Sequence, residues 1–219
     1  NSAYELEATE DHEIFTLHGK KKLKELKLNE DKVLIQCDEG LFNKDSTLPF
    51  EVKNEYIGKN GRLYKFNFPT TWSKELGQIA GLLVGDGWIN DEKDCRVGFT
   101  FSKDDKEILD YVKLIINDFY GCNIKEVERK SISHLSYHSK YLMNFFKLLG
   151  VTSNKADSKI VPHTIFTAPR EAVTGFLQGL FTADGTIGYQ RKHHSYIRLT
   201  SKSLRLLKEV QILLSNFGI

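Results

Sequence analysis

The period of the hydrophobic positions changes along this chain near residue 70. Before that point, apolar and polar residues alternate in short runs, as in YELEAT at 4–9 and HEIFTLHG at 12–19. Alternation with period two predicts β-strands, and the GKNG sequence between two further runs predicts a hairpin turn. After that point, apolar residues recur every three to four positions over longer stretches, which predicts helices. We therefore expect a β-rich domain over 1–70 and a second domain over 71–219.

The second domain is predicted to contain an internal repeat of helix, two strands and helix. Its predicted helices cover 72–85, 104–119, 140–149, 170–183 and 203–216. Strands are expected in RVGFTFS, where Val97, Phe99 and Phe101 share one face, and in TIGYQ and YIRLTS. Because the elements recur at offsets of 97 to 99 residues, we assign repeat one to 72–150 and repeat two to 170–219. Repeat two is incomplete, since repeat one continues with a further hairpin and helix.

Two similar stretches open the repeats: IAGLLVGDG at 79–87 and LQGLFTADG at 177–185. Each has a small residue every four positions, which places the small residues on one face of a helix. A glycine inside a helix costs about 1 kcal/mol relative to alanine, so the face must gain something in return. Close approach of another backbone is the usual gain. We expect the two helices to pack against each other along these faces.

This packing would place Asp86 and Asp184, which are 98 residues apart in the sequence, side by side at two helix ends. The C-terminal end of a helix is negative and the two carboxylates repel each other, so the position is unfavourable on its own. A divalent cation between them would remove the conflict, and Mg²⁺ is commonly held by one or two carboxylates plus substrate phosphate. The simpler alternative is two buried helices that both end in Asp-Gly, a common turn pair.

Composition and charge narrow the functional classes. No apolar run approaches the length of a membrane span, and three scattered cysteines indicate a reducing compartment, so we expect a cytoplasmic protein without a membrane partner. The net charge is +2, but residues 120–219 carry 14 basic and 6 acidic residues, whereas 71–119 carry 6 basic and 10 acidic residues. An acidic patch within a basic surface suits a metal site that acts on a phosphate-bearing substrate.

The two motifs, their spacing and the segment TSKSLRLLKEVQILLSNFGI resemble the LAGLIDADG homing endonucleases in their two-motif, single-chain form, over residues 72–219. This resemblance implies an α+β fold with pseudo-two-fold symmetry, in which two αββα-type repeats present saddle-shaped antiparallel sheets to double-stranded DNA. It also implies that Asp86 and Asp184 are catalytic and bind Mg²⁺ or Mn²⁺. The expected reaction is metal-dependent phosphodiester hydrolysis that makes a double-strand break. No small-molecule cofactor is expected.

The first 70 residues resemble part of the splicing (Hint) domain of inteins. LEATEDHEIFT looks like a Thr-x-x-His block at Thr9 and His12, and KIVPHTIF looks like the block that carries a catalytic lysine, here Lys159. The resemblance implies that Thr9 and His12 activate a scissile amide and that Lys159 neutralises charge or orders water. The chain departs from the family in lacking the first-residue nucleophile and the terminal His-Asn pair. We therefore expect that this chain alone does not splice.

Basic residues on or beside the polar faces of the predicted strands are expected to contact DNA. The candidates are Arg96, Arg129, Lys130, Arg191, Lys192, His193, His194 and Arg198. Two alternatives remain open from the sequence. The first alternative to an active endonuclease is a segment of a split self-splicing intein with an inactive nuclease, whose missing segments come from a complementary intein fragment. The second is a DNA- or RNA-binding module on the same scaffold.

Overall fold

The computed structural model describes residues 4–35, 38–91, 94–153, 155–190 and 194–219. The chain forms two compact units: Asn1–Leu41 together with Gln211–Ile219, and Phe42–Val210. We expected a boundary near residue 70. In the structure, residues 42–70 instead belong to the larger unit. Within the described residues, every helix is too short or too polar to cross a membrane.

The smaller unit contains an antiparallel hairpin of β1 (Glu13–Thr16) and β2 (Gly19–Lys22), followed by the short 3-10 helix η1 (Leu23–Glu25). Ile14 and Thr16 point inward and are buried, as the alternating pattern predicted. The strand expected at 4–9 is absent from the described residues. The side chain of Tyr4 instead hydrogen-bonds Ser215, with 2.5 Å between the two hydroxyl oxygens.

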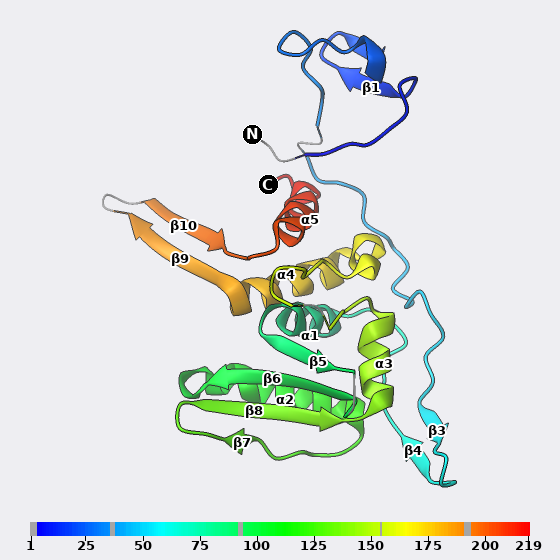
Figure 1. The fold of residues 1–219 in the computed structure, drawn as a ribbon, viewed down its shortest axis with the longest axis vertical. Coiled ribbons are helices and arrows are strands. Elements are labelled where there is room, and N and C mark those ends of the chain that lie inside the picture. The colour runs from blue at the N-terminus through cyan, green and yellow to red at the C-terminus, as the bar shows by residue number, and fades with distance from the viewer. Residues whose placement is uncertain (1–3, 36–37, 92–93, 154, 191–193) are drawn as a thin grey trace. The chain divides into compact units, whose positions relative to one another are not determined.

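Two long helices form the centre of the larger unit (Figure 1). They are α1 (Lys74–Gly85) and α4 (Arg170–Asp184), and they pack against each other along most of their length. Ser73 caps α1, since its hydroxyl accepts a hydrogen bond of 3.1 Å from the backbone N–H of Leu76. Both helices occur within two residues of their predicted bounds, and their mutual packing confirms the prediction made from the small-residue spacing.

The first repeat carries a four-stranded antiparallel sheet with the strand order β5-β6-β8-β7. These strands are β5 (Gly87–Asn90), β6 (Arg96–Ser102), β7 (Val127–Glu128) and β8 (Ile132–His138). Val97, Phe99 and Phe101 are buried on one face, which confirms the alternation predicted for β6. Helices α2 (Lys106–Tyr120) and α3 (Lys140–Leu148) contact β6.

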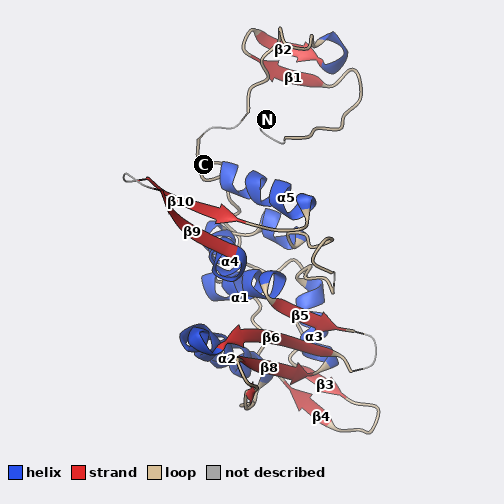
Figure 2. Ribbon diagram, turned by 60° about the vertical axis from the view of Figure 1, so that its left-hand side comes forward, coloured by secondary structure: helices blue, strands red, loops and turns tan. Residues whose placement is uncertain are grey.

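The second repeat has the same order of elements (Figure 2). After α4 come β9 (Gly185–Gln190) and β10 (His194–Leu199), which form an antiparallel pair, and then α5 (Leu204–Ser215). The segment between the repeats contains the 3-10 helix η3 (His163–Thr167), and η2 (Lys103–Asp105) precedes α2. The order helix, strand, strand, helix therefore occurs twice, as the sequence repeat predicted.

Residues 42–70 join the larger unit through aromatic packing. The predicted hairpin is formed by β3 (Glu55–Ile57) and β4 (Leu63–Lys65). Phe68 stacks on Phe145 of α3 with 4.8 Å between ring centroids, and Tyr56 stacks on Tyr141 at 4.0 Å. Buried aromatic pairs contribute more than their area alone, which explains why this segment packs with the helices that follow it.

Candidate active site

The small residues of α1 and α4 allow the two backbones to touch. A side-chain carbon added at Gly81 would come within 3.0 Å of the carbonyl oxygen of Phe176, and one at Gly179 would come equally close to the carbonyl oxygen of Gln78. Any larger residue at these positions would force the helices apart. The repeated glycines therefore set the distance between the C-terminal ends of the two helices.

The two predicted acids adjoin each other at those ends. Asp86 directly follows α1, Asp184 is the last residue of α4, and a strand begins immediately after each of them. A side-chain carbon built at Gly85 would contact Ala183 and would lie 3.8 Å from Oδ2 of Asp184. Each chain reversal from helix into strand thus leaves one carboxylate at the junction of the two repeats, as predicted.

The two carboxylates are electrostatically coupled. The side chain of Asp86 is open to solvent on one side, but partial burial of its carboxyl group raises its pKa above the usual 3.8, and the negative charge of Asp184 raises it further. Lys159 opposes this effect, while Asp105, located just before α2, adds to it. A site that raises the pKa of a carboxylate favours a positive charge beside it.

Lys159 supplies one such charge. Its Nζ lies 3.7 Å from Oδ2 of Asp184 and donates a hydrogen bond to the carbonyl oxygen of Gly85 at the end of α1. Both charged side chains are mostly buried, with 20% and 24% of their surface exposed. The sequence resemblance singled out Lys159, and the structure places its side chain against the C-terminal ends of both α1 and α4.

The first turns of α5 hold the segment that carries Lys159. The hydroxyl of Ser203 donates a 2.6 Å hydrogen bond to the carbonyl oxygen of Lys159 and also accepts one from Leu206 at the start of α5. The backbone N–H of Val161 donates to Oε2 of Glu209 at 2.7 Å. Ser203 and Glu209 were not predicted from the sequence. Their hydrogen-bond partners lie more than forty positions away, and no local sequence pattern indicates such contacts.

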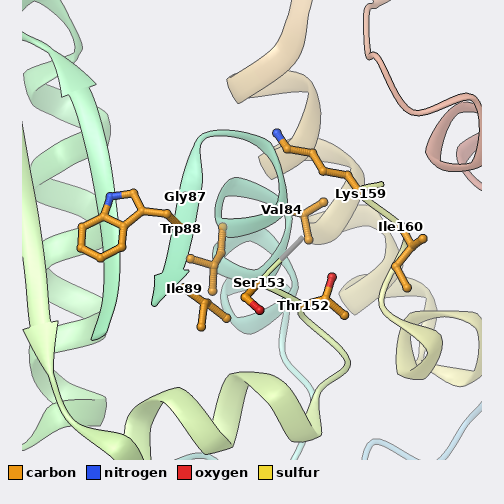
Figure 3. A pocket seen from close by; sticks show the side chains of 9 residues that line it. Val84, Gly87, Trp88, Ile89, Thr152, Ser153, Lys159 and Ile160 are labelled. Atoms are coloured by element: carbon orange, nitrogen blue, oxygen red, sulfur yellow. The ribbon is translucent and has the colours of Figure 1, made fainter. Parts of the chain in front are cut away.

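Two cavities flank the junction. One of about 80 Å³ lies between Lys159, Ile160 and the residues that begin β5, among them Trp88 (Figure 3). Another of about 280 Å³ is lined by Asp86, Asp105 and Thr182, together with residues of β6. Asp86 lines the second cavity and is exposed, so an external group can reach its carboxylate.

The donor set fits a divalent cation that is only partly held by protein. The described residues contain no group of three or more His, Cys, Asp or Glu side chains arranged to enclose a metal. Two coupled carboxylates with neighbouring open space match the way Mg²⁺ binds, because Mg²⁺ keeps several water ligands and takes others from substrate phosphate.

The open face of the first sheet is polar and carries residues that sequence analysis did not select. His134 and Ser136 alternate with buried residues along β8, and Nδ1 of His134 lies 2.9 Å from the hydroxyl of Thr100 on β6. The ring of Trp88 covers Gly98, where an added side-chain carbon would come within 3.0 Å of the indole. The alternation along β8 was the available signal for this face.

The predicted DNA-contacting residues are spread over several elements. Arg96, on β6, forms an ion pair with Asp94, while Arg129 and Lys130 are exposed in the turn between β7 and β8. Arg198 is exposed on β10, with its guanidinium 5.1 Å from the ring centroid of Tyr196. His194 begins β10. Arg191, Lys192 and His193 lie outside the described residues.

The two predicted splicing residues belong to the smaller unit. The backbone N–H of His12 donates a 3.0 Å hydrogen bond to the carbonyl oxygen of Thr9, which places both residues in one turn just before β1. Both are exposed. The structure therefore brings Thr9 and His12 together with each other in one unit, and Asp86, Asp184 and Lys159 together in the other.

Comparison with known proteins finds a family match over the second repeat. Residues 171–219 match the family model of a LAGLIDADG-like domain. The chain is 30% identical over 228 residues to a DNA polymerase from Thermococcus sp. (strain GE8), covering 100% of this chain and 12% of the polymerase. It is 32% identical over 156 residues to a glutamine–fructose-6-phosphate aminotransferase from Methanocaldococcus jannaschii, covering 69% and 13% respectively.

A further relative is the ribonucleoside-diphosphate reductase NrdEB subunit alpha from Bacillus subtilis, 27% identical over 236 residues, with 99% of this chain and 19% of that protein covered. The chain thus spans only about an eighth to a fifth of the length of these relatives. The match to the LAGLIDADG-like family model covers Asp184 and the strands and helix that follow it.

Among solved structures, the chain is similar to variants of the homing endonuclease I-DmoI. One is 18% identical, with a TM-score of 0.46 and coverage of 67% of this chain and 74% of the other. A second, solved in complex with its target DNA and in the presence of manganese, is 19% identical, with a TM-score of 0.48 and coverage of 66% and 76%.

Proposed function

We propose that this chain is a site-specific DNA endonuclease embedded in an intein. The observation that carries the proposal is the junction of α1 and α4, where Asp86 and Asp184 adjoin each other and Lys159 contacts both helix ends. Glycine contacts fix this arrangement, so it is preorganised and does not depend on a substrate to assemble it. The proposed substrate is double-stranded DNA, and the proposed reaction is hydrolysis of one phosphodiester in each strand.

Each of the three residues has a proposed role. Asp86 and Asp184 would hold Mg²⁺ or Mn²⁺, which supplies a Lewis acid and a source of hydroxide when bound. By holding the cation there, the two carboxylates would direct the scissile phosphate to the seam between the repeats. Lys159 donates hydrogen bonds in a mostly buried setting, where a cation stabilises the negative charge that develops on the phosphate oxygens.

The proposed DNA contacts are the exposed basic residues Arg129, Lys130 and Arg198, together with Arg96 at the start of β6. Contacts with phosphate position a duplex without reading its sequence, and base contacts in the grooves specify it. The polar face of β6 and β8, with Thr100 and His134, is suited to the second task, because hydroxyl and imidazole groups hydrogen-bond base edges.

The intein setting is supported by the variety of the relatives. A DNA polymerase, an aminotransferase and a reductase share no reaction, yet each matches this chain over a small part of its own length. A segment inserted into unrelated host proteins accounts for that pattern. The turn containing Thr9 and His12 supports a splicing block in the smaller unit.

The proposal is tested with a plasmid that carries the host gene from which the insertion has been removed. We expect the wild-type chain to cut this plasmid with Mg²⁺, and Asp86→Asn and Asp184→Asn to bind the same DNA without cutting it. Independently of activity, millimolar Mg²⁺ should raise the thermal midpoint of the wild-type chain and not that of the Asp86→Asn, Asp184→Asn double variant. If all three proteins bind DNA and none cuts it, the enzyme proposal fails.

A second candidate function is an autoprocessing segment whose partner is a complementary intein fragment. The smaller unit exposes large apolar side chains that a further polypeptide segment would cover. They include Phe15, Leu17, Leu28, Leu34 and Ile35, with exposed fractions from 52% to 90%. Appearance of a ligated product when the chain is mixed with flanking intein fragments, and not with unrelated peptides, would favour this candidate. A DNA- or RNA-binding module would show binding with neither reaction.

A further inference from the structure

A basic groove lies on the larger unit outside the acid pair and the sheet face described above. It has a volume of about 730 Å³ and runs between the β3–β4 hairpin, the C-terminal end of α2 and the N-terminal end of α3. Its lining includes five basic side chains and, among the described residues, no carboxylate. The basic residues are Lys59, Arg62, Lys65, His138 and Lys140.

Most of this positive charge is available to an external anion. Lys65 is partly neutralised, since its Nζ lies 3.1 Å from Glu55 in an exposed ion pair. Within the described part of the chain, Lys59, Arg62 and Lys140 form no ion pair with a carboxylate, and all three are exposed. Uncompensated cations gathered on one concave surface attract a polyanion.

The groove is continuous with the candidate DNA-binding face of the first sheet. His138 lines the groove and is the last residue of β8, where it pairs in register with Arg96 of β6. A duplex lying on the polar face of the sheet could therefore continue past the end of β8 toward the hairpin. The charge of the groove then complements the phosphates of the DNA flank.

The aromatic side chains of the groove indicate duplex rather than single-stranded DNA. The guanidinium of Arg62 lies 5.3 Å from the ring centroid of Tyr64, and Nζ of Lys140 lies 4.8 Å from that of Tyr141. The ring of Tyr141 also stacks on Tyr56. Single-strand binding surfaces need open aromatic faces on which bases stack, and here the rings are already covered.

Resting on the proposed function, we infer that this groove binds the phosphate backbone of the duplex flanking the cleavage site. The contact is independent of sequence and extends the DNA-binding surface from the repeats onto the β3–β4 hairpin. It gives residues 55–65, which lie outside both sequence repeats, a role in holding DNA.

The test measures binding of the full chain to a labelled 40-base-pair duplex of random sequence by fluorescence anisotropy, over about 50 to 200 mM salt. The groove variant is Lys59→Glu, Arg62→Glu. The matched control is Lys44→Glu, Lys53→Glu, which makes the same change in net charge at exposed residues outside the groove. All substituted residues are exposed, so circular dichroism should show both variants folded.

We expect the groove variant to bind the duplex at least about tenfold more weakly than the control, and its plot of log affinity against log salt to be less steep by about 1.8, or 0.9 for each lost phosphate contact. Its loss on a single-stranded 40-mer should be smaller. Equal weakening by both variants, or a larger loss on the single strand, would overturn the inference while leaving the endonuclease proposal standing. A wild-type chain that binds no duplex at all would instead overturn the proposed function and this inference with it.

Discussion

At the scale of single residues, Asp86 illustrates how a candidate site conflicts with stability. Its carboxylate is partly buried beside a second acid, and both effects raise its pKa above the usual 3.8. The folded state therefore holds the proton more tightly than the unfolded state does. As pH rises, Asp86 ionises first in the unfolded state, near pH 3.8, and only at a higher pH in the folded state. Ionisation therefore stabilises the unfolded state more than the folded state, so the charge of Asp86 lowers the stability of the fold at neutral pH.

Removing this charge should stabilise the protein. We expect Asp86→Asn to raise the thermal midpoint at pH 7, and the difference from wild type to shrink as pH is lowered through the raised pKa and below 3.8, where Asp86 becomes protonated in both states. The control is Asp110→Asn, which removes an exposed carboxylate 3.4 Å from Lys106. A midpoint for Asp86→Asn at or below the wild-type value at pH 7 would contradict this account.

Lys159 permits a second test at the residue scale. Replacing it by methionine keeps the length of the side chain but removes the cation beside Asp184. We expect kcat for DNA cleavage to fall by about 10²–10³-fold, because the developing charge loses a preorganised donor, while DNA affinity changes less than threefold. Lys155→Met, at an exposed lysine in the same segment, serves as the control and should leave kcat unchanged. Equal losses in the two variants would remove Lys159 from the mechanism.

At the scale of elements, the helix pair α1–α4 is the most constrained part of the fold. Its glycines lie where an added side-chain carbon would meet backbone atoms of the facing helix, which cannot move aside as a flexible side chain can. The energetic penalty of glycine within a helix is therefore offset by the close contact that it permits. Spacing within one helix encodes this contact, which is why the sequence alone predicted it.

Substituting one of these glycines should separate the helices. We expect Gly81→Ala to lower the free energy of unfolding by at least about 2 kcal/mol, even though alanine has the higher helix propensity, because its methyl group would come within 3.0 Å of the Phe176 carbonyl oxygen. Gln178→Ala, at an exposed position on α4, should change it by less than about 0.5 kcal/mol. Urea unfolding of both variants measures the difference. A neutral or stabilising Gly81→Ala would show that the helix pair can relax.

Other elements were less accessible to sequence reasoning, for physical reasons. The repeat predicted two strands after α1, but β5 was not located in the sequence, because Gly87–Asn90 is a four-residue run, too short to show a period. The expected strand at 4–9 has the right alternation but forms no ladder within the described residues. Residues 42–70 were assigned to the first domain because the hydrophobic period changes only near residue 70, whereas stacking of Phe68 on Phe145 joins them to α3. Contacts between residues far apart in the chain decided each of these outcomes.

At the scale of the whole molecule, the chain divides its candidate chemistry between two compact units. Thr9 and His12 lie in the unit formed by Asn1–Leu41 and Gln211–Ile219, and Asp86, Asp184 and Lys159 lie in Phe42–Val210. The acid pair is held by contacts within its own unit, through the glycines of α1 and α4 and the bonds from Ser203 and Glu209. Among the described residues, the contacts that hold the proposed nuclease site therefore come from the larger unit.

This separation predicts that the two proposed functions are independent. We expect His12→Ala to leave kcat/KM for DNA cleavage within twofold of wild type, whereas Asp184→Asn abolishes cleavage. In the reciprocal experiment, Asp184→Asn should leave any ligation with flanking intein fragments unchanged, and His12→Ala should abolish it. The first measurement uses the plasmid assay, and the second uses electrophoresis of the mixed fragments. A loss of cleavage in His12→Ala comparable to that in Asp184→Asn would mean that the smaller unit contributes to the DNA-cutting site, and the assignment of one function to each unit would have to be abandoned.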